Sequence, residues 1–588
     1  MGKGMPGLVL DQATEASGRR SQHGLNGEQD KEGKQSNRSR SPKYRSHKQL
    51  VYAELIILAA DNDYMQPGLD NQGVELVFGR NCILPLMTVR VRFAPSPTGH
   101  LHVGNVRTAL YNWLFARQHH GVFILRVEDT DVGRSDRRFE QDLMNDLKWL
   151  NLTWDEGVDA PGDHGPYRQM DRLALYRNFA QRLLDEKKAY HCFCSSDELE
   201  ETRQEKLAAG LPYHYSGKCR ELPPEAARKR LQEGEPAALR MKVRPGTVGF
   251  EDIVFGSLQA DCREIGDFVF LRSDQTAPYN FACVIDDAAM KITHVIRGEG
   301  HISNTYRQLL IYEALGFDPP RFAHLSTILG TDGSKLSKRH GATSIAEFRK
   351  QGYLPEALVN YLALLGWAPA QEGTEILAPE RLTSQFDLSK VNRSPATFDW
   401  EKLNWVNRSH LKELSLPRLT ELALPFFVRC GWVSPDPSQE VKAWLGVVIE
   451  ALLKYANKIE DLVTEADLIF AFAPEKDLAE AAVQETLSQE GAGEVIRKFH
   501  DLVQQHEALN LETYKEIVSA VKAATGHKGQ QLFHPIRVAL TGRSSGIELN
   551  RLIPILEKAA LLEFPTKIVP AKERVTIIHD YIRNQPGQ

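Results

Sequence analysis

Two short segments carry residue types that suit phosphate chemistry. The first is His102-Val103-Gly104, which follows a turn rich in Pro and Gly, and the second is the polar loop Lys335-Leu336-Ser337-Lys338-Arg339. Glycine lets a ligand approach the backbone, and the N-terminus of a helix offers free N–H groups to an anion. A histidine can donate a hydrogen bond to a phosphate, and a mobile basic loop can neutralise a departing pyrophosphate. Each segment alone is ambiguous, since an ordinary turn or a solvated lysine-rich loop has the same composition.

The elements around the first segment form a strand, a turn, a helix and a second strand. Val89–Phe93 alternates as a short strand, and a turn continues through Gly99. A helix is expected from about Gly104 to His119, followed by a buried strand at Val122–Val127. This βαβ order predicts a parallel sheet with a ligand site beyond the strand ends.

The rest of the chain divides by pattern. An amphipathic helix is expected over 171–187, and residues 190–275 resemble an insertion with cysteines and short strands. Sheet-like sequence resumes at Tyr279–Ile285 and Ile292–Ile296. From about Glu347 the chain is expected to be mostly helical, with Pro and Gly at the breaks.

Length and composition set outer bounds on the protein class. A chain of 588 residues is expected to form several domains. Its 42% hydrophobic and 25% charged residues are ordinary for a globular protein, and the net charge of −5 does not indicate a nucleic-acid partner. No run of about 18 apolar residues predicts a membrane span, and no signal-like start is present. Seven cysteines in so long a chain favour a reducing cytosol, so a cytoplasmic location is expected.

The first 86 residues differ in character from the remainder of the chain. Residues 1–50 are rich in Gly, Ser, Gln, Lys and Arg, which predicts disorder, and 51–86 show no clear period. The globular pattern begins at Met87, so 1–86 is expected to be upstream sequence from a wrong start. The alternative is a real extension, such as a targeting or RNA-binding tail.

Together the two phosphate-suited segments resemble the signature pair of class I aminoacyl-tRNA synthetases. In that family the first segment reads His-Ile-Gly-His and the second reads Lys-Met-Ser-Lys-Ser. Here Asn105 stands at the second histidine, Leu336 at the Met, and Arg339 at the final Ser. Arg339 keeps a positive charge, whereas a hydrogen bond to ATP from a second histidine is missing.

Longer strings resemble the glutamyl-tRNA synthetase family over roughly 88–570. They are Arg92–Gly99, Arg126–Asp131, Gly165–Gln169, Val295–Glu299, His301–Thr305 and Phe533–Gly542. The resemblance implies an α/β fold: a class I Rossmann-like catalytic domain with an inserted α+β acceptor-binding domain, followed by an all-α anticodon-binding region. The implied boundaries are 88–167 and 279–330 (catalytic), 168–278 (acceptor-stem insertion), 331–410 (stem contact with the KLSKR loop), 411–575 (anticodon region) and 576–588 (tail).

The resemblance also implies roles for individual residues. His102, Gly104, Lys335 and Lys338 would be catalytic. The ATP site would comprise Pro95, Ser96, Thr98, His102, Gly104, Asn105, Lys335, Ser337, Lys338 and Arg339. The glutamate site would comprise Arg92, Ala94, Ser96, Glu128, Tyr279 and Arg297, in which the two arginines pair with the two carboxylates and Glu128 holds the α-ammonium. Cys283 stands where relatives are expected to have Val or Asn.

The implied reaction has two steps. The α-carboxylate of L-glutamate attacks the α-phosphate of ATP to give glutamyl-adenylate and pyrophosphate, and the terminal ribose of tRNA(Glu) then attacks the mixed anhydride. Mg²⁺ is expected on the phosphates. The enzyme is expected to be a monomer, and bound tRNA usually supports activation in this family. Candidate tRNA contacts are Trp400, Trp405, Arg408 and Lys528. Tyr455 stands where an arginine is associated with strict tRNA choice, which favours charging of tRNA(Gln) as well.

Three cysteines in the insertion suit a structural zinc site. Many relatives carry zinc there on a Cys-x-Cys pair and a later pair. Cys192, Cys194 and Cys219 would supply thiolates, and Tyr215 or Glu221 the fourth ligand. The alternative is three half-buried cysteines without metal.

Three other functions share parts of this pattern. A relative that glutamylates a tRNA base lacks the anticodon domain, whereas about 250 residues follow Lys338 here. A glutaminyl-tRNA synthetase has β-barrel anticodon domains, whereas this C-terminal half is expected to be helical. A non-catalytic RNA-binding paralogue would have lost His102, Gly104 or Lys338, and all three are present.

Overall fold

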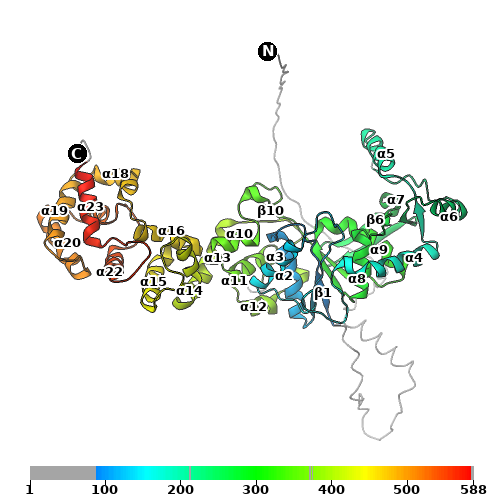
Figure 1. The fold of residues 1–588 in the computed structure, drawn as a ribbon, viewed down its shortest axis with the longest axis horizontal. Coiled ribbons are helices and arrows are strands. Elements are labelled where there is room, and N and C mark those ends of the chain that lie inside the picture. The colour runs from blue at the N-terminus through cyan, green and yellow to red at the C-terminus, as the bar shows by residue number, and fades with distance from the viewer. Residues whose placement is uncertain (1–87, 211–212, 370–372, 374, 585–588) are drawn as a thin grey trace, which may run out of the picture. The chain divides into compact units, whose positions relative to one another are not determined.

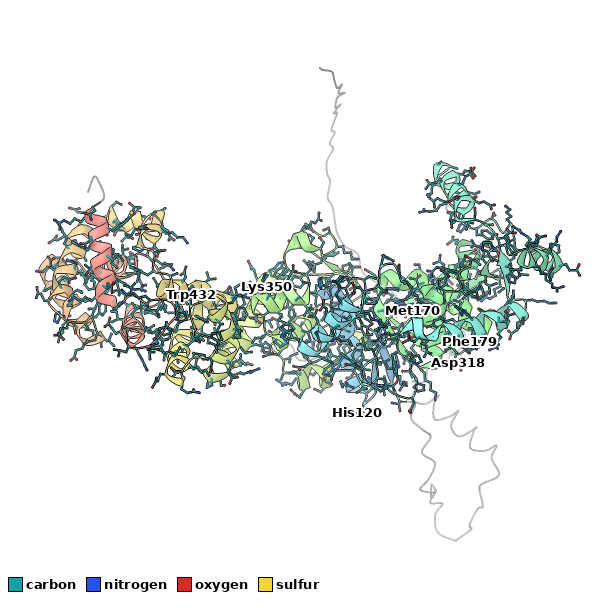
Figure 2. The ribbon with its side chains drawn as sticks, in the orientation of Figure 1. His120, Met170, Phe179, Asp318, Lys350 and Trp432 are labelled. Atoms are coloured by element: carbon teal, nitrogen blue, oxygen red, sulfur yellow. The ribbon has the colours of Figure 1, made fainter. Side chains whose placement is uncertain are left out.

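A computed structural model describes residues 88–210, 213–369, 373 and 375–584. The expectations for residues 1–86 lie outside these described residues. The expected βαβ unit is confirmed: β1 (Arg90–Phe93) pairs in parallel with β2 (Val122–Leu125), and α2 (Val103–Gln118) connects them. His120 has a positive φ of 50° in the turn between α2 and β2 (Figure 2).

Two later strands extend this parallel arrangement. In β8 (His294–Gly298) and β9 (Arg321–Leu325) the register places Arg297 opposite His324. The chain just before β8 lies beside β1, since the Thr293 amide donates to the Arg90 carbonyl at 2.9 Å. The antiparallel hairpin β5 (Thr247–Asp252) and β6 (Gly256–Asp261) joins the far side of β9. Residues of the expected insertion therefore complete the sheet that carries Arg297 (Figure 1).

Between β2 and β8 the chain forms one helix-and-strand segment. Its short antiparallel sheet has the order β3-β4-β7. The elements are α3 (Arg137–Trp149), the 3₁₀ turn η1 (Gln169–Arg172), α4 (Leu173–Asp185), β3 (Ala189–Cys192), α5 (Ser196–Ala208), α6 (Pro224–Gln232), β4 (Ala238–Met241), α7 (Cys262–Ile265) and β7 (Val269–Leu271). The helix expected over 171–187 is thus η1 followed by α4.

The strand predicted at Tyr279–Ile285 is wrong, because these residues begin α8 (Tyr279–Ala289). Phe281, Val284 and Ile285 are all fully buried, so the segment shows no polar face that would reveal a helical period. A short continuous apolar run cannot distinguish a buried strand from a buried helix. The correction matters for function because α8 carries Cys283 and Asp287 beneath the candidate site.

The C-terminal half is helical, as expected. It follows η2 (Glu299–His301), α9 (Ile302–Leu315), β10 (Ile328–Leu329) and η3 (Lys338–His340). The later elements are α10 (Ile345–Gln351), α11 (Pro355–Leu364), α12 (Pro379–Gln385), η4 (Leu388–Lys390), β11 (Ala396–Thr397), α13 (Trp400–Glu413), α14 (Leu416–Arg429), α15 (Gln439–Leu452), η5 (Leu453–Tyr455), α16 (Ile459–Phe470), α17 (Pro474–Leu478), α18 (Ala481–Leu487), α19 (Ala492–Gln504), α20 (Leu511–Thr525), α21 (Gln530–Thr541), α22 (Leu549–Ala559) and α23 (Ala571–Arg583).

Packing inside this helical half is aromatic and apolar. Trp432, labelled in Figure 2, stacks on Phe470 with the ring planes 3° apart. Ile578 of α23 is fully buried. The helix α23 therefore crosses the boundary expected at residue 575, and its residues up to Arg583 are not a separate tail. None of the helices in the described ranges is both long and apolar enough to cross a membrane.

Candidate active site

A cavity of about 1490 Å³ lies at the N-terminus of α2 and beyond the ends of β1, β2 and β8. It brings together most of the residues expected to bind ATP and glutamate. Those lining it are Arg92, Ala94, Pro95, Ser96, Thr98, His102, Gly104, Asn105, Glu128, Tyr279, Arg297, Lys335 and Ser337. Arg339 is not among the lining residues and pairs instead with Asp332 at 2.9 Å. The side chain of Lys338 lies outside what the structure describes.

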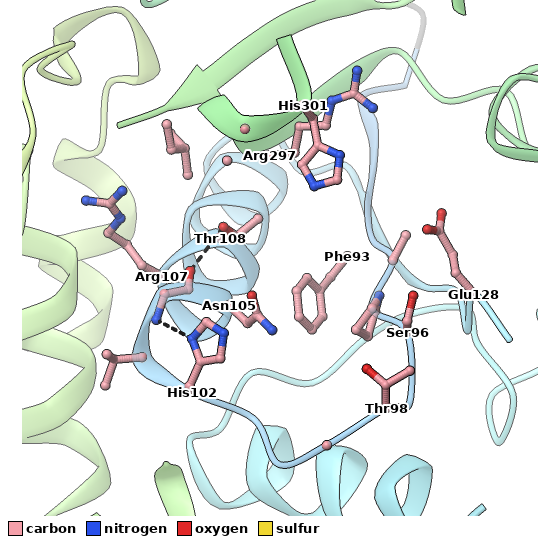
Figure 3. Close-up of a pocket in the computed structure, with 18 of the residues that line it drawn as sticks. Phe93, Ser96, Thr98, His102, Asn105, Arg107, Thr108, Glu128, Arg297 and His301 are labelled. Atoms are coloured by element: carbon pink, nitrogen blue, oxygen red, sulfur yellow. Dashed lines mark hydrogen bonds between the residues drawn. The ribbon is translucent and has the colours of Figure 1, made fainter. Parts of the chain in front are cut away.

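His102 is the N-cap of α2. Its Nδ1 accepts a hydrogen bond from the Gly104 amide at 3.2 Å, so the ring proton belongs on Nε2 (Figure 3). Burial, together with the charge of Lys335, lowers the pKa of His102, which favours the neutral ring. The ring thus satisfies one amide of the helix N-terminus and keeps Nε2–H available to donate to a ligand.

The lysine loop is joined to the same helix end. The amide of Val103 donates to the Thr343 carbonyl at 3.0 Å, and the Ile345 amide donates to the Leu101 carbonyl at 3.0 Å. Within the loop the Ser337 amide donates to His340 Nδ1 at 3.0 Å. The ring of His340 lies 2.8 Å from where a Cβ on Gly330 would stand, so a side chain at residue 330 would force the ring to move. The two phosphate-suited segments therefore meet at one cavity.

Arg297 presents a buried guanidinium to this cavity. Its Nη1 donates to Tyr279 Oη at 3.1 Å, and its Nη2 donates at 2.7 Å to both Thr305 Oγ1 and Gln308 Oε1. Its Nε donates to His324 Nε2 at 3.3 Å. None of these four partners carries a negative charge. In the described part of the chain, no carboxylate forms a salt bridge with Arg297. A buried cation that faces a cavity without a counter-charge can receive an anionic ligand.

Arg92 has a different environment. Its Nε and Nη2 donate to the Asp287 carboxylate at 3.0 and 3.2 Å, and both side chains are almost fully buried. Arg126 donates to the same carboxylate at 2.6 Å and to Glu128 at 3.0 Å. Cys283 Sγ lies 3.7 Å from Arg92 Nη2 and 3.6 Å from Arg126 Nη2. The charge of Arg92 is therefore largely balanced by α8 before any substrate binds.

Glu128 lies at the cavity wall directly after β2. Burial raises its pKa, and the charges of Arg126 and Arg92 oppose that effect. A bound ammonium would further favour the ionised carboxylate. In Figure 3, Glu128 and Ser96 lie on one side of the cavity, with His102 and Asn105 on the other. Residues expected to bind glutamate and residues expected to bind ATP thus line one cavity.

Three thiols gather in the insertion, as their spacing predicted. Cys192, Cys194 and Cys219 hold their sulfur atoms within 4.8 Å of one another. Tyr215 Oη lies 3.5 Å from Cys192 Sγ and 3.4 Å from Cys194 Sγ, whereas Glu221 is largely exposed. Burial raises the pKa of Cys192, but hydrogen bonds from Arg240 and Tyr215 outweigh it and lower the pKa overall. The three sulfurs suit a zinc site, and Tyr215 lies next to them whereas Glu221 is exposed.

Sequence reasoning missed Asp287, His324 and Asp252, which hold the two arginines in place. Asp286 and Asp287 are consecutive acids inside an apolar segment, and such a pair indicates buried ion pairing. The expectation of a strand there hid this signal. For Asp252 and His324, which are 72 residues apart, the sequence carries no local indication of contact.

The parallel sheet, the helix N-terminus and the basic loop around one cavity define a class I synthetase catalytic site. Residues 88–405 match the model for tRNA synthetases class I (E and Q), catalytic domain, and residues 418–563 match an anticodon binding domain.

Similarity to individual proteins identifies the family within this class. The glutamate–tRNA ligase of Carboxydothermus hydrogenoformans is 48% identical over 473 residues, which cover 80% of this chain and 98% of that protein. The ligase of Aquifex aeolicus is 45% identical, covering 80% and 96%. A crystal structure of a glutamate tRNA ligase from Elizabethkingia meningosepticum, in complex with its amino acid, superposes with a TM-score of 0.72 at 32% identity, covering 84% and 99%. The chain belongs to the glutamate–tRNA ligase family.

Proposed function

We propose that this protein attaches L-glutamate to the 3′ end of tRNA(Glu), using ATP and a glutamyl-adenylate intermediate. The observation that carries the proposal is the unpaired guanidinium of Arg297 in the same cavity as the His102 helix cap. An anionic amino acid and a nucleotide can thus be held side by side. The relatives named above are glutamate–tRNA ligases, which supports the choice of substrate.

In the glutamate half of the cavity, Arg297 and Tyr279 receive the side-chain carboxylate. A cation without a protein counter-charge favours an acid over its amide, so glutamine binds less well. Arg92, whose charge is balanced by Asp287, contributes a hydrogen bond through its remaining Nη1. Glu128 accepts the α-ammonium, and Ser96 and the backbone at Ala94 complete the contacts.

In the ATP half, the N-terminus of α2 at Gly104 lets phosphate oxygens approach the backbone. His102 donates from Nε2 to the α-phosphate as its charge grows under attack by the glutamate carboxylate. Pro95, Thr98 and Asn105 line the nucleotide side. Lys335, Ser337 and Lys338 close over the departing pyrophosphate, with Arg339 strengthening the positive field of the loop. Mg²⁺ carried on the phosphates offsets their charge, and the chain's own residues orient the reactants.

We propose the same division of the chain for tRNA binding as the sequence indicates. Residues 168–278 contact the acceptor end, 331–410 the stem, and 411–575, with the remainder of α23, the anticodon. The anticodon-domain match argues against base glutamylation, which needs no such region. The retained His102 and Gly104 argue against a non-catalytic paralogue. A structural zinc on the three thiols and Tyr215 would stabilise the insertion, and the protein would act as a monomer.

Charging of purified tRNA(Glu) with labelled glutamate, ATP and Mg²⁺ tests the main proposal, and a folded protein that charges no tRNA would overturn it. The same assay with tRNA(Gln) tests the choice of tRNA. Tyr455 is 37% exposed and is held by a hydrogen bond from its Oη to the Gly546 carbonyl at 3.0 Å. This position lacks the arginine associated with strict choice, so we expect tRNA(Gln) to be charged as well. Charging of tRNA(Glu) alone would contradict that expectation.

A further inference from the structure

The orientation of Arg297 depends on a histidine in the neighbouring strand. Parallel register places Arg297 of β8 directly opposite His324 of β9, with both side chains on one face of the sheet. The guanidinium Nε donates to His324 Nε2 at 3.3 Å, and the histidine is fully buried. This contact fixes the Nε edge of the guanidinium, while Tyr279 accepts from Nη1, and Thr305 and Gln308 accept from Nη2. Among these four partners, His324 is thus the one that holds Arg297 from the neighbouring strand.

His324 is in turn held by Asp252, at the end of β5 in the hairpin of the insertion. One carboxylate oxygen lies 2.6 Å from His324 Nδ1, and the His324 amide donates to the same carboxylate at 3.1 Å. The other oxygen accepts from the amides of Val254 and Phe255 at 3.0 and 2.9 Å. The carboxylate is therefore fixed on both sides, by the hairpin turn and by the histidine.

These contacts select one tautomer of His324. An ionised carboxylate can only accept, so the proton of the neutral ring is on Nδ1. Nε2 is then left as an acceptor, which is what Arg297 Nε–H requires. Burial lowers the pKa of His324, and although the hydrogen bond to Asp252 opposes that effect, the neutral ring is favoured. If the proton moved to Nε2, Thr305 Oγ1 at 3.1 Å could accept it, but Arg297 Nε–H would lose its acceptor and face a second donor across the 3.3 Å contact.

We propose that Asp252 and His324 are positioning residues for glutamate: Asp252 fixes the tautomer of His324, and His324 fixes the guanidinium of Arg297 that receives the substrate carboxylate. This inference rests on the proposed function of Arg297. It also means that the hairpin β5–β6, contributed by the insertion, supports amino-acid recognition in the sheet that it joins.

The Asp252→Asn variant tests the tautomer step. The amide oxygen can keep the hydrogen bonds from Val254 and Phe255, which places the NH₂ group against His324 Nδ1. The ring proton must then move to Nε2, and Arg297 Nε loses its acceptor. We expect the KM for glutamate in tRNA(Glu)-dependent pyrophosphate exchange to rise roughly ten- to hundred-fold, with little change in the KM for ATP.

A second substitution distinguishes positioning from mere folding. In His324→Gln, the amide oxygen can accept from Arg297 Nε without any tautomer, so Asp252 is no longer needed for that purpose. Adding Asp252→Asn to His324→Gln should therefore raise the glutamate KM much less than it does in the wild-type background. If instead the fold-increases in glutamate KM of the two single variants multiplied in the double variant, the proposed action of Asp252 through His324 would be overturned.

Two further variants keep the test decisive. Asp261→Asn, on the exposed end of the same hairpin, should leave both KM values unchanged. If Asp252→Asn fails to fold, His324→Phe should raise the glutamate KM while His324→Gln restores it. Equal values for Phe and Gln, or parallel changes in the KM for ATP, would refute the positioning role. Wild-type protein without glutamate-dependent exchange or charging would instead refute the proposed function itself.

Discussion

Asp287 of α8 accepts two hydrogen bonds from Arg92, at 3.0 and 3.2 Å. A third comes from Arg126 at 2.6 Å, and all three side chains are buried. Although burial raises the pKa of Asp287, the two guanidinium groups outweigh it and lower the pKa to about 2. The carboxylate thus stays ionised and balances part of the positive charge under the glutamate half of the cavity. Arg297 has no such partner among the described residues, so the two arginines expected to act alike have different roles.

Asp287→Asn should destabilise the catalytic region strongly. The change keeps the side-chain shape but leaves two buried guanidinium groups without their shared counter-charge. Breaking a buried ion pair from one side typically costs about 3–5 kcal/mol. Thermal unfolding monitored by circular dichroism should show a clearly lower midpoint.

Asp159→Asn is the matched control for the lower melting midpoint expected of Asp287→Asn. Its carboxylate pairs with Lys148 at 2.8 Å on the surface, where such pairs contribute about 1 kcal/mol or less. Equal small shifts for Asp159→Asn and Asp287→Asn would contradict the stabilising role of the buried cluster.

His102→Asn separates the structural role of His102 from its role toward ATP. Asparagine is a good N-cap, so it can replace Nδ1 as acceptor for the Gly104 amide and keep α2 intact. It cannot replace the Nε2 donor. The rate of pyrophosphate exchange should fall about 10²–10³-fold, as for the loss of other transition-state donors, while the melting midpoint stays near that of the wild type. An unchanged rate in the folded variant would remove His102 from the mechanism.

The βαβ unit could be predicted because an alternating strand, a Pro- and Gly-rich turn and a second apolar strand bound α2, although α2 itself is buried on most of its faces. The cavity residues that were predicted lie in recognisable segments that resemble a known family. The supports of those residues were not predicted. Asp287 lies in a helix whose residues 281–287 are all buried, so that no exposed face reveals the helical period, and His324 meets Asp252 only through sheet register. Such contacts arise from tertiary pairing, which a single sequence does not encode locally.

Tyr215→Phe should weaken metal binding in the insertion. Removing the phenol oxygen leaves three thiols and one open position, so zinc content after exposure to a mild chelator should fall below that of the wild type. Glu221→Gln is the matched control, because Glu221 is 89% exposed and should not affect zinc content. Metal content is measured by atomic emission. Equal retention in both variants would exclude Tyr215 as a ligand, and absence of zinc from purified wild-type protein would exclude the site.

His294 should make the protein less stable in mild acid. Burial, with the charges of Arg321 and His119, lowers its pKa from 6.5 to about 4. Between these two values the unfolded chain binds a proton that the folded protein does not, so stability present above pH 6.5 is lost as the pH falls toward 4. At pH 5 this linkage amounts to up to about 2 kcal/mol, at about 1.4 kcal/mol per pKa unit.

The His294→Gln variant isolates this effect, because glutamine does not titrate. The variant loses its ring contact with Phe115 at every pH, so its melting midpoint should be lower than wild type at pH 7. Between pH 7 and pH 5, however, its midpoint should fall less than that of the wild type, since one proton uptake by the unfolded chain has been removed. Because the midpoints at pH 7 and pH 5 are compared within the same protein, the loss of the ring contact, which is the same at both pH values, does not affect the difference. Parallel falls in both proteins would show that His294 is protonated in the folded state as readily as in the unfolded one.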